Sequence, residues 1–163
     1  MLQYEIPAFK ADSKFTANGK PVLDIPANQT VYAIWIGTND LGNDAFLTDS
    51  QVPGKTLPDY TECVFQIMDA LYNNGGRYFV LLNVAPLNLF PQYSVPSQGG
   101  LAASQFWKNK GSNITEISYR MAESVASVNE IFKYRAASAL LLENRYKGAQ
   151  AAIFDTNALV QSQ

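Results

Sequence analysis

The hydrophobic positions of this chain form three short runs that alternate with two longer stretches of helical periodicity. The runs lie at residues 31–36, 77–84 and 151–154, and each has an unbroken apolar centre. Short runs that are apolar on both faces are typical of parallel strands that helices cover on both sides. Apolar residues recur with the period of a helix over 59–74 and 113–147, and more weakly over 2–15. Strand, helix and strand in this order predict right-handed parallel crossovers.

Turn and capping residues mark the ends of these elements. Asn18-Gly19 predicts a turn in an exposed loop. Asn113, three positions before Glu116, makes a capping box at the start of the second long helix, and Gly148 provides its stop. The predicted fold class is α/β, with at least three parallel strands in a single domain of residues 1–163. Three strands make a thin sheet, because sheets most often have about four to six.

The amino-acid composition excludes several classes of partner and cofactor. The formal net charge is -2 and Lys and Arg are scattered, so the chain has no basic stripe of the kind that binds nucleic acid. No stretch approaches the roughly 20 apolar residues that span a bilayer, and residues 1–9 lack the apolar core of a signal peptide. The chain has no histidine, and its acidic residues form no ligand cluster. We therefore expect no nucleic-acid partner, no membrane partner, no metal and no other cofactor.

Two Asn-x-Thr tripeptides, which begin at Asn28 and Asn113, match the pattern for N-glycosylation. Together with the low charge and the many Tyr, Asn, Gln and Ser residues, they favour a secretory origin. Cys63 is the sole cysteine and cannot form an internal disulfide. It is interpreted as a small buried apolar residue on a helix.

Candidate chemistry follows the first strand, where Gly37-Thr38-Asn39-Asp40 ends the apolar run. Ligands of parallel sheets bind beyond the carboxyl ends of the strands. A side-chain amide fixed at such a place can donate a hydrogen bond to the negative oxygen that forms when an ester is attacked. One such donor stabilises the oxyanion by about 2.7–4 kcal/mol. The competing interpretation is that Thr38, Asn39 or Asp40 only caps a following helical turn.

This turn, after the apolar run, resembles the Gly-x-Asn-Asp block of the SGNH/GDSL esterase family. Residues 71–87 and 153–156 are similar to later segments of its fungal secreted branch, the acetylesterases of carbohydrate esterase family 16, in the same order and spacing. The resemblance implies a three-layer αβα flavodoxin-like fold, present in part, and hydrolysis of small acyl esters such as acetylated carbohydrates. It assigns Asn39 to the oxyanion hole and Gly37 to the turn that holds it. Complete members of this branch are secreted.

The resemblance also identifies what this chain lacks. The family takes its serine from a Gly-Asp-Ser turn and its base from an Asp-x-x-His block, and neither is present. Thr48-Asp49-Ser50 follows no predicted strand, and Asp155, with no histidine to orient, is interpreted as a helix cap. The chain is therefore expected to be a central fragment of the family domain. We expect it to be inactive or nearly so, because loss of a triad member costs several orders of magnitude in rate.

Two further expectations follow. In the family fold a missing strand lies beside the one that begins at Val31, so self-association through that unpaired apolar edge is expected. An alternative function is a non-catalytic carbohydrate-binding or interaction protein with Trp35, Tyr93 and Trp107 as stacking residues. Against it, Trp35 lies inside a strand and is expected in the core. Tyr93 and Trp107 belong to a long predicted loop over 88–111, and they can serve only to cover it.

Overall fold

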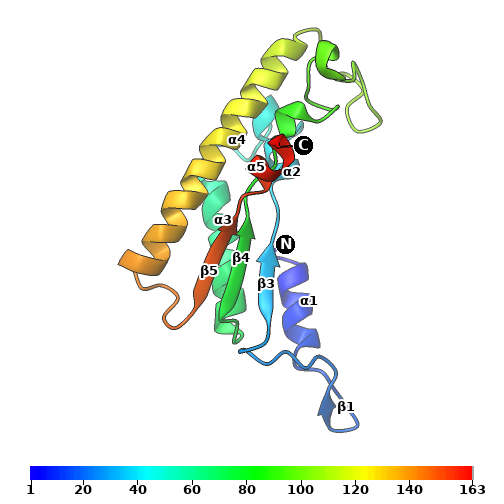
Figure 1. Cartoon of the computed structure of the whole chain (residues 1–163). Helices are drawn as coiled ribbons and strands as arrows, with labels where there is room; N and C mark the ends of the chain where they lie inside the picture. Colours follow the sequence, from blue (N-terminus) through cyan, green and yellow to red (C-terminus); the bar gives the residue numbers. More distant parts are fainter. Residues whose placement is uncertain (163) are drawn as a thin grey trace.

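The structure is a computed structural model that describes residues 1–162, and its helices and strands alternate along the chain (Figure 1). The main elements are α1 (Glu5–Asp12), β1 (Thr16–Ala17), β2 (Lys20–Pro21), β3 (Val31–Ile34), α2 (Thr38–Leu41), α3 (Leu57–Asn73), β4 (Tyr78–Leu82), α4 (Ile114–Ala137), β5 (Gln150–Phe154) and α5 (Thr156–Gln161). Short 3-10 helices, η1 (Phe46–Thr48), η2 (Leu87–Leu89) and η3 (Pro96–Gln98), and a π-helix, η4 (Ser138–Leu142), complete them. Within residues 1–162, no helix has both the length and the apolar character needed to cross a membrane.

Three parallel strands form the central sheet in the order β3-β4-β5, which confirms the predicted α/β class. In this register Val31 lies opposite Tyr78, and Tyr78 lies opposite Gln150. The observed strands differ from the predicted runs by only one or two residues at either end. The predicted turn at Asn18-Gly19 is also present. It joins β1 and β2 into a small antiparallel hairpin that the sequence pattern did not indicate.

The two faces of the sheet differ in what covers them. Ile34, Phe79 and Leu81 are buried on the face that lies against α3, behind the sheet in Figure 1. On the opposite face Val31 is 60% exposed, and none of the helices in residues 1–162 lies in front of the strands (Figure 1). The expectation that helices cover β3 on both sides is therefore wrong for this chain. Trp35, expected in the core, follows the end of β3 and is 59% exposed, because no part of the described chain packs over this face.

The helix α3 supplies much of the core. It begins at Leu57, two residues before the expected position, because the backbone N–H and the hydroxyl of Thr56 both donate to the carboxylate of Asp59, at 2.9 and 2.6 Å. Its buried positions include Val64, Phe65, Ile67, Met68 and Leu71. Cys63 lies on this helix but on its exposed side, so its interpretation as a buried residue is wrong. The buried stripe includes Tyr60 and Val64, and position 63 turns toward water.

The long helix α4 confirms its predicted start but not its predicted end. Asn113 accepts a hydrogen bond from the N–H of Glu116 at 3.2 Å and donates one to its carboxylate at 2.6 Å. The α-helix stops at Ala137, and a π-helix carries the chain to Leu142. Ala139 in this π-helix is still fully buried, but Leu141 and Leu142 are exposed, so the predicted buried stripe does not extend to Leu141. Gly148 ends no helix and lies in a turn with a positive φ.

Packing and ion pairs join α3 to α4. The ring of Phe132 on α4 lies 6.2 Å from the ring of Tyr60 and 6.4 Å from that of Phe65. At the outer surface Arg135 binds Glu62 at 3.1 Å, and Glu62 also accepts from a second arginine, Arg145, at 2.8 Å. The helices α3 and α4 therefore form one packed layer behind the sheet. The loops at the carboxyl ends of β3 and β4 pack against this layer, and these loops contain the candidate site residues.

Candidate functional site

Asn39 lies in a single helical turn, α2, directly beyond the carboxyl end of β3. Gly37 is the N-cap residue of this turn, and its carbonyl accepts the N–H of Leu41 at 2.9 Å. No side chain in the described part of the structure caps α2, so the interpretation of Thr38, Asn39 or Asp40 as its cap is wrong. The side chain of Asn39 is exposed and has no hydrogen-bond partner among residues 1–162. Its amide is free to bind a ligand.

Gly37 fixes the start of this turn. Its φ is 131°, which side-chain-bearing residues rarely adopt, and a Cβ there would overlap the hydroxyl of Tyr60. That hydroxyl donates to the carbonyl of Ile36 at 2.9 Å. Burial, and then the nearby carboxylate of Asp40, raise the pKa of Tyr60, so the hydroxyl keeps its proton and its hydrogen bond. The structure places Gly37 at the predicted turn, and its part in an oxyanion hole stays a prediction.

A hollow of about 440 Å³ opens beside Asn39. It lies between α2 with the residues that follow it and the loop over 88–111, and it is lined by Thr38, Asn39, Gly42, Asn43, Phe90, Gln92, Tyr93 and Phe106. Two residues singled out in the sequence, Asn39 and Tyr93, thus meet in one hollow. Tyr93 is only 5% exposed, and burial raises the pKa of its hydroxyl. Tyr93 therefore forms the floor of the hollow and offers little surface for stacking.

Trp107 does not line the hollow and instead supports Tyr93. The two rings lie 6.2 Å apart, and the ammonium group of Lys110 lies 5.9 Å from the ring of Trp107. Lys110 is itself buried and donates to the carbonyl of Leu101 at 2.7 Å. These contacts hold the loop together. A role for Tyr93 or Trp107 in binding substrate stays a prediction.

The sequence reasoning missed four residues of this hollow. Phe90 and Phe106 form apolar walls, while Asn43 and Gln92 lie between them and α2. Gln92 donates to the side-chain oxygen of Asn43 at 3.1 Å, and Asn43 donates to the carbonyl of Phe106 at 3.1 Å. The predicted long loop over 88–111 was the only signal for Phe90, Gln92 and Phe106, and no signal pointed to Asn43. Each contact joins residues 49 or 63 positions apart, a separation that no local pattern reports.

The two other segments that were weighed as catalytic, Thr48-Asp49-Ser50 and Asp155, have structural partners. Asp49 follows η1, not a strand, and binds Arg120 through both oxygens at 2.9 and 3.0 Å. Ser50, next in the chain, is within 3.1 Å of the hydroxyl of Thr48. Asp155 is the N-cap residue of α5 and accepts the N–H of Ala158 at 2.9 Å, which confirms its interpretation as a helix cap. That N–H, and then the amide of Asn83, lower the pKa of Asp155.

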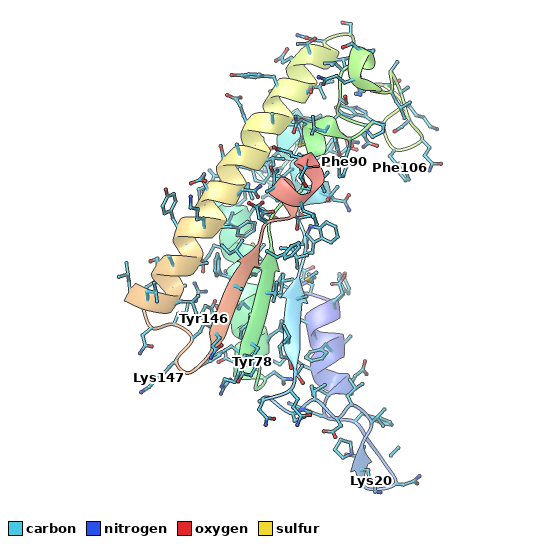
Figure 2. All side chains as sticks on the ribbon, in the orientation of Figure 1. Lys20, Tyr78, Phe90, Phe106, Tyr146 and Lys147 are labelled. Atoms are coloured by element: carbon cyan, nitrogen blue, oxygen red, sulfur yellow. The ribbon has the colours of Figure 1, made fainter. Side chains whose placement is uncertain are left out.

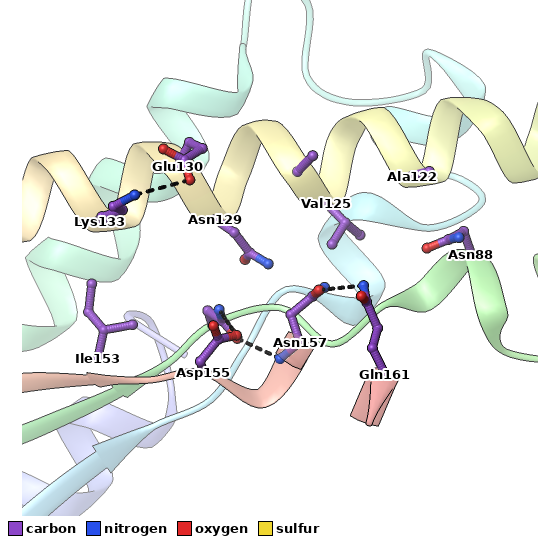
Figure 3. Close-up of a pocket in the computed structure, with 12 residues that line it drawn as sticks. Asn88, Ala122, Val125, Asn129, Glu130, Lys133, Ile153, Asp155, Asn157 and Gln161 are labelled. Carbon is purple, nitrogen blue, oxygen red and sulfur yellow. Dashed lines mark hydrogen bonds and ion pairs between the residues drawn. The ribbon is translucent and has the colours of Figure 1, made fainter. Parts of the chain in front are cut away.

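A second hollow, of about 580 Å³, lies between α4, the end of β5 and α5 (Figure 3). Asn157 and Gln161 point into it from α5, and Asn129 reaches toward it from α4. The polar groups here are largely paired with one another. Asn129 accepts the N–H of Val84 at 2.8 Å and donates to its carbonyl at 2.9 Å, while Asn157 donates to that same carbonyl at 3.1 Å. This network fixes the carboxyl ends of β4 and β5 rather than leaving groups for a ligand.

Three further expectations concern ligands outside this site. Residues 1–162 contain no group of three or more His, Cys, Asp or Glu side chains placed to hold a metal ion. Asn28 lies exposed in the loop before β3, whereas the side chain of Asn113 is engaged in capping α4. Glycosylation of either residue stays a prediction. Self-association also stays a prediction, and among the described strands β3 pairs only with β4, so its other edge is open.

The chain is similar in sequence to two known esterases. The chain is 41% identical over 157 residues to an acetylesterase of Hypocrea jecorina, across 96% of this chain and 44% of the acetylesterase. It is 27% identical over 111 residues to the GDSL esterase/lipase ACHE of Zea mays, across 63% of this chain and 27% of that protein. No protein-family model matches the chain. The chain therefore spans less than half the length of both relatives.

Proposed function

Because this chain belongs to the SGNH/GDSL esterase family and is similar to an acetylesterase, we propose that it provides the oxyanion-binding part of an ester-hydrolysing site. Asn39 is the proposed donor, and Gly37 the residue that shapes its turn. The observation that carries the proposal is the position of the Asn39 amide. It lies beyond the carboxyl end of a parallel strand, beside a hollow, and without a hydrogen-bond partner in residues 1–162.

The chemistry of this part is electrostatic. Attack on an ester carbonyl moves negative charge onto its oxygen, and a donor about 2.7–3.1 Å from that oxygen lowers the barrier. A donor that is already in position before the reaction needs little rearrangement while the charge develops. The contacts of Gly37 with Tyr60 and of Asn43 with Phe106 hold the two sides of the hollow in place, which supports this role for Asn39.

We also propose that this chain does not turn over esters by itself. Acyl transfer needs a nucleophile and a base that takes its proton. The 163 residues include no histidine, and Ser50 hydrogen-bonds with Thr48 rather than with a base. The similarity to an acetylesterase supports small acyl esters as substrates of a complete protein of this kind, with acetylated carbohydrates as the more specific choice. Membership of carbohydrate esterase family 16 and secretion of the complete protein are parts of the same proposal.

Hydrolysis of p-nitrophenyl acetate tests the inactivity. We expect the release of p-nitrophenol by the chain to equal that of a buffer blank, and Asn39→Ala to change nothing. A robust rate that disappears in Asn39→Ala would overturn the proposed inactivity and would require a nucleophile among the present residues.

Binding tests the role of Asn39 directly. In the ¹⁵N-labelled chain, ethyl acetate should shift the side-chain N–H signals of Asn39, because its carbonyl accepts from that amide. Asn28 offers a matched internal control, since it is exposed and lies outside the hollow. Equal shifts at both amides, or none at Asn39, would count against the proposed donor.

A second candidate function is carbohydrate binding without catalysis. It is favoured by the exposure of Phe106, 70%, at the rim of the hollow. A binding module recognises the sugar itself, whereas an esterase remnant recognises the ester. Equal affinity for xylotriose and for its acetylated form would favour the binding module, and preference for the acetylated form would favour the esterase remnant.

A further inference from the structure

A third hollow, of about 600 Å³, adjoins the one beside Asn39. The two share Phe90, Gln92 and Phe106, so these three side chains form a common wall. Beyond that wall the third hollow is lined by Pro91, Leu101, Ser104 and Gln105. Figure 2 shows Phe90 and Phe106 together at the end of the molecule beyond the carboxyl ends of the strands. The third hollow therefore lies next to the one that contains Asn39.

The polar groups of the common wall are occupied. The side-chain oxygen of Gln92 accepts from the hydroxyl of Ser104 at 3.3 Å, and its nitrogen donates to Asn43 at 3.1 Å. Asn43 in turn donates to the carbonyl of Phe106 at 3.1 Å. Because these groups bind one another, the surface left for a ligand is mainly the rings of the two phenylalanines and the side chain of Leu101, which is 49% exposed.

We infer that this third hollow binds the alcohol part of the substrate ester, and that it favours a ring with an apolar face there. This inference rests on the proposed role of Asn39. When an ester carbonyl lies at Asn39, its acyl group and its alcohol group extend in different directions. An acetyl group adds only one methyl group beyond the carbonyl, so we assign the larger alcohol group to the third hollow. Aromatic rings favour offset or edge-to-face contacts at about 4.5–7 Å between centroids, which Phe90 and Phe106 offer to a phenyl group.

The test compares phenyl acetate with ethyl acetate, each titrated into the ¹⁵N-labelled chain. Phenyl acetate should bind about tenfold more tightly, because its ring buries apolar surface that the ethyl group lacks. It should also shift backbone signals of residues 101–105, which line only the third hollow or adjoin it and which ethyl acetate leaves in place. Acetate release is followed in the same samples, so that any hydrolysis is seen.

Phe106→Ala should weaken the binding of phenyl acetate by about two- to tenfold, the effect of losing one aromatic contact, and should weaken the binding of ethyl acetate less, because the ethyl group makes no ring contact. The hydrogen bond from Asn43 goes to the backbone of Phe106, so the loop keeps its anchor. Phe15→Ala is the matched control, since Phe15 is also exposed and lines neither hollow. Thermal melts of both variants check that they are folded.

The outcomes separate this inference from the proposed function. If Asn39→Ala weakens the binding of both esters while Phe106→Ala weakens the binding of neither, the inference is wrong and the proposed role of Asn39 stands. If Phe106→Ala weakens the binding of phenyl acetate while Asn39→Ala changes the affinity for neither ester, the third hollow binds aromatic rings but the proposed function is wrong. Equal affinity of the unaltered chain for the two esters, or no binding of either, overturns the inference.

Discussion

Replacing Gly37 by alanine tests whether the turn that carries Asn39 depends on close packing. An added Cβ would overlap the hydroxyl of Tyr60 and lie 3.2 Å from its Cζ and 3.3 Å from a methyl group of Val84. Tyr60 cannot move away freely, because it is buried, packs against Phe132 and donates to the carbonyl of Ile36. The substitution must therefore displace either the turn or the tyrosine.

The expected loss of stability has three parts. Holding an L-residue at positive φ costs about 1–2 kcal/mol, and forcing a methyl group into a packed site costs about 1–3 kcal/mol. Disturbing the hydrogen bond of Tyr60 costs about 0.5–1.5 kcal/mol. Together they lower the free energy of unfolding of Gly37→Ala by about 2.5–6.5 kcal/mol, a large part of the 5–15 kcal/mol that is typical of a domain.

Urea denaturation followed by circular dichroism measures this loss. Gly54→Ala is the matched control, because Gly54 also has a positive φ, 79°, but no atom lies within 4 Å of its added Cβ. That variant should lose only the backbone part, about 1–2 kcal/mol. In a Tyr60→Phe background the cost of Gly37→Ala should become smaller, because the overlapping hydroxyl is gone. An equal cost for the two glycines would refute the packing argument.

Two further predictions concern the sheet and its ends. Asp155 has a lowered pKa in the folded chain, so its contribution to stability is present above its ordinary pKa, about 3.9, and is lost as the pH falls through the lowered value. At pH 6, Asp155→Ala should lower the unfolding free energy by about 1 kcal/mol, the usual effect of losing an N-cap. This difference from the unaltered chain should shrink below about pH 4. A difference that does not change with pH would contradict the prediction. Val31→Lys should reduce self-association in sedimentation velocity, because a charge on an edge strand opposes pairing with a second chain. Val52 is also exposed but lies outside the sheet, so Val52→Lys should not reduce self-association. If the two variants self-associate to the same extent, the edge of β3 is not the contact.

The parts of the fold that the sequence predicted well are those set by neighbouring residues. The β-branched and aromatic runs predicted three strands within one or two residues, and Asn113 with Glu116 predicted the start of α4. Both predictions depend on residues that are only a few positions apart, so they do not require knowledge of which distant segments meet. The predicted burial of Cys63 failed because apolar periodicity defines a stripe only to within one position on a helix. The predicted cover of β3 failed because a strand cannot report what packs over its second face.

By itself, the sequence determined the α/β class, the Gly37-Thr38-Asn39-Asp40 turn after the first strand, the absence of histidine and the resemblance to SGNH/GDSL esterases. Only the tertiary structure decided that Asn39 is no helix cap, that Tyr93 is buried beneath the hollow beside Asn39, and that Phe106 lines two hollows. The reason is physical. Strand formation and capping depend on interactions between near neighbours, whereas a hollow depends on which distant segments meet, here residues 39–43 and 90–106.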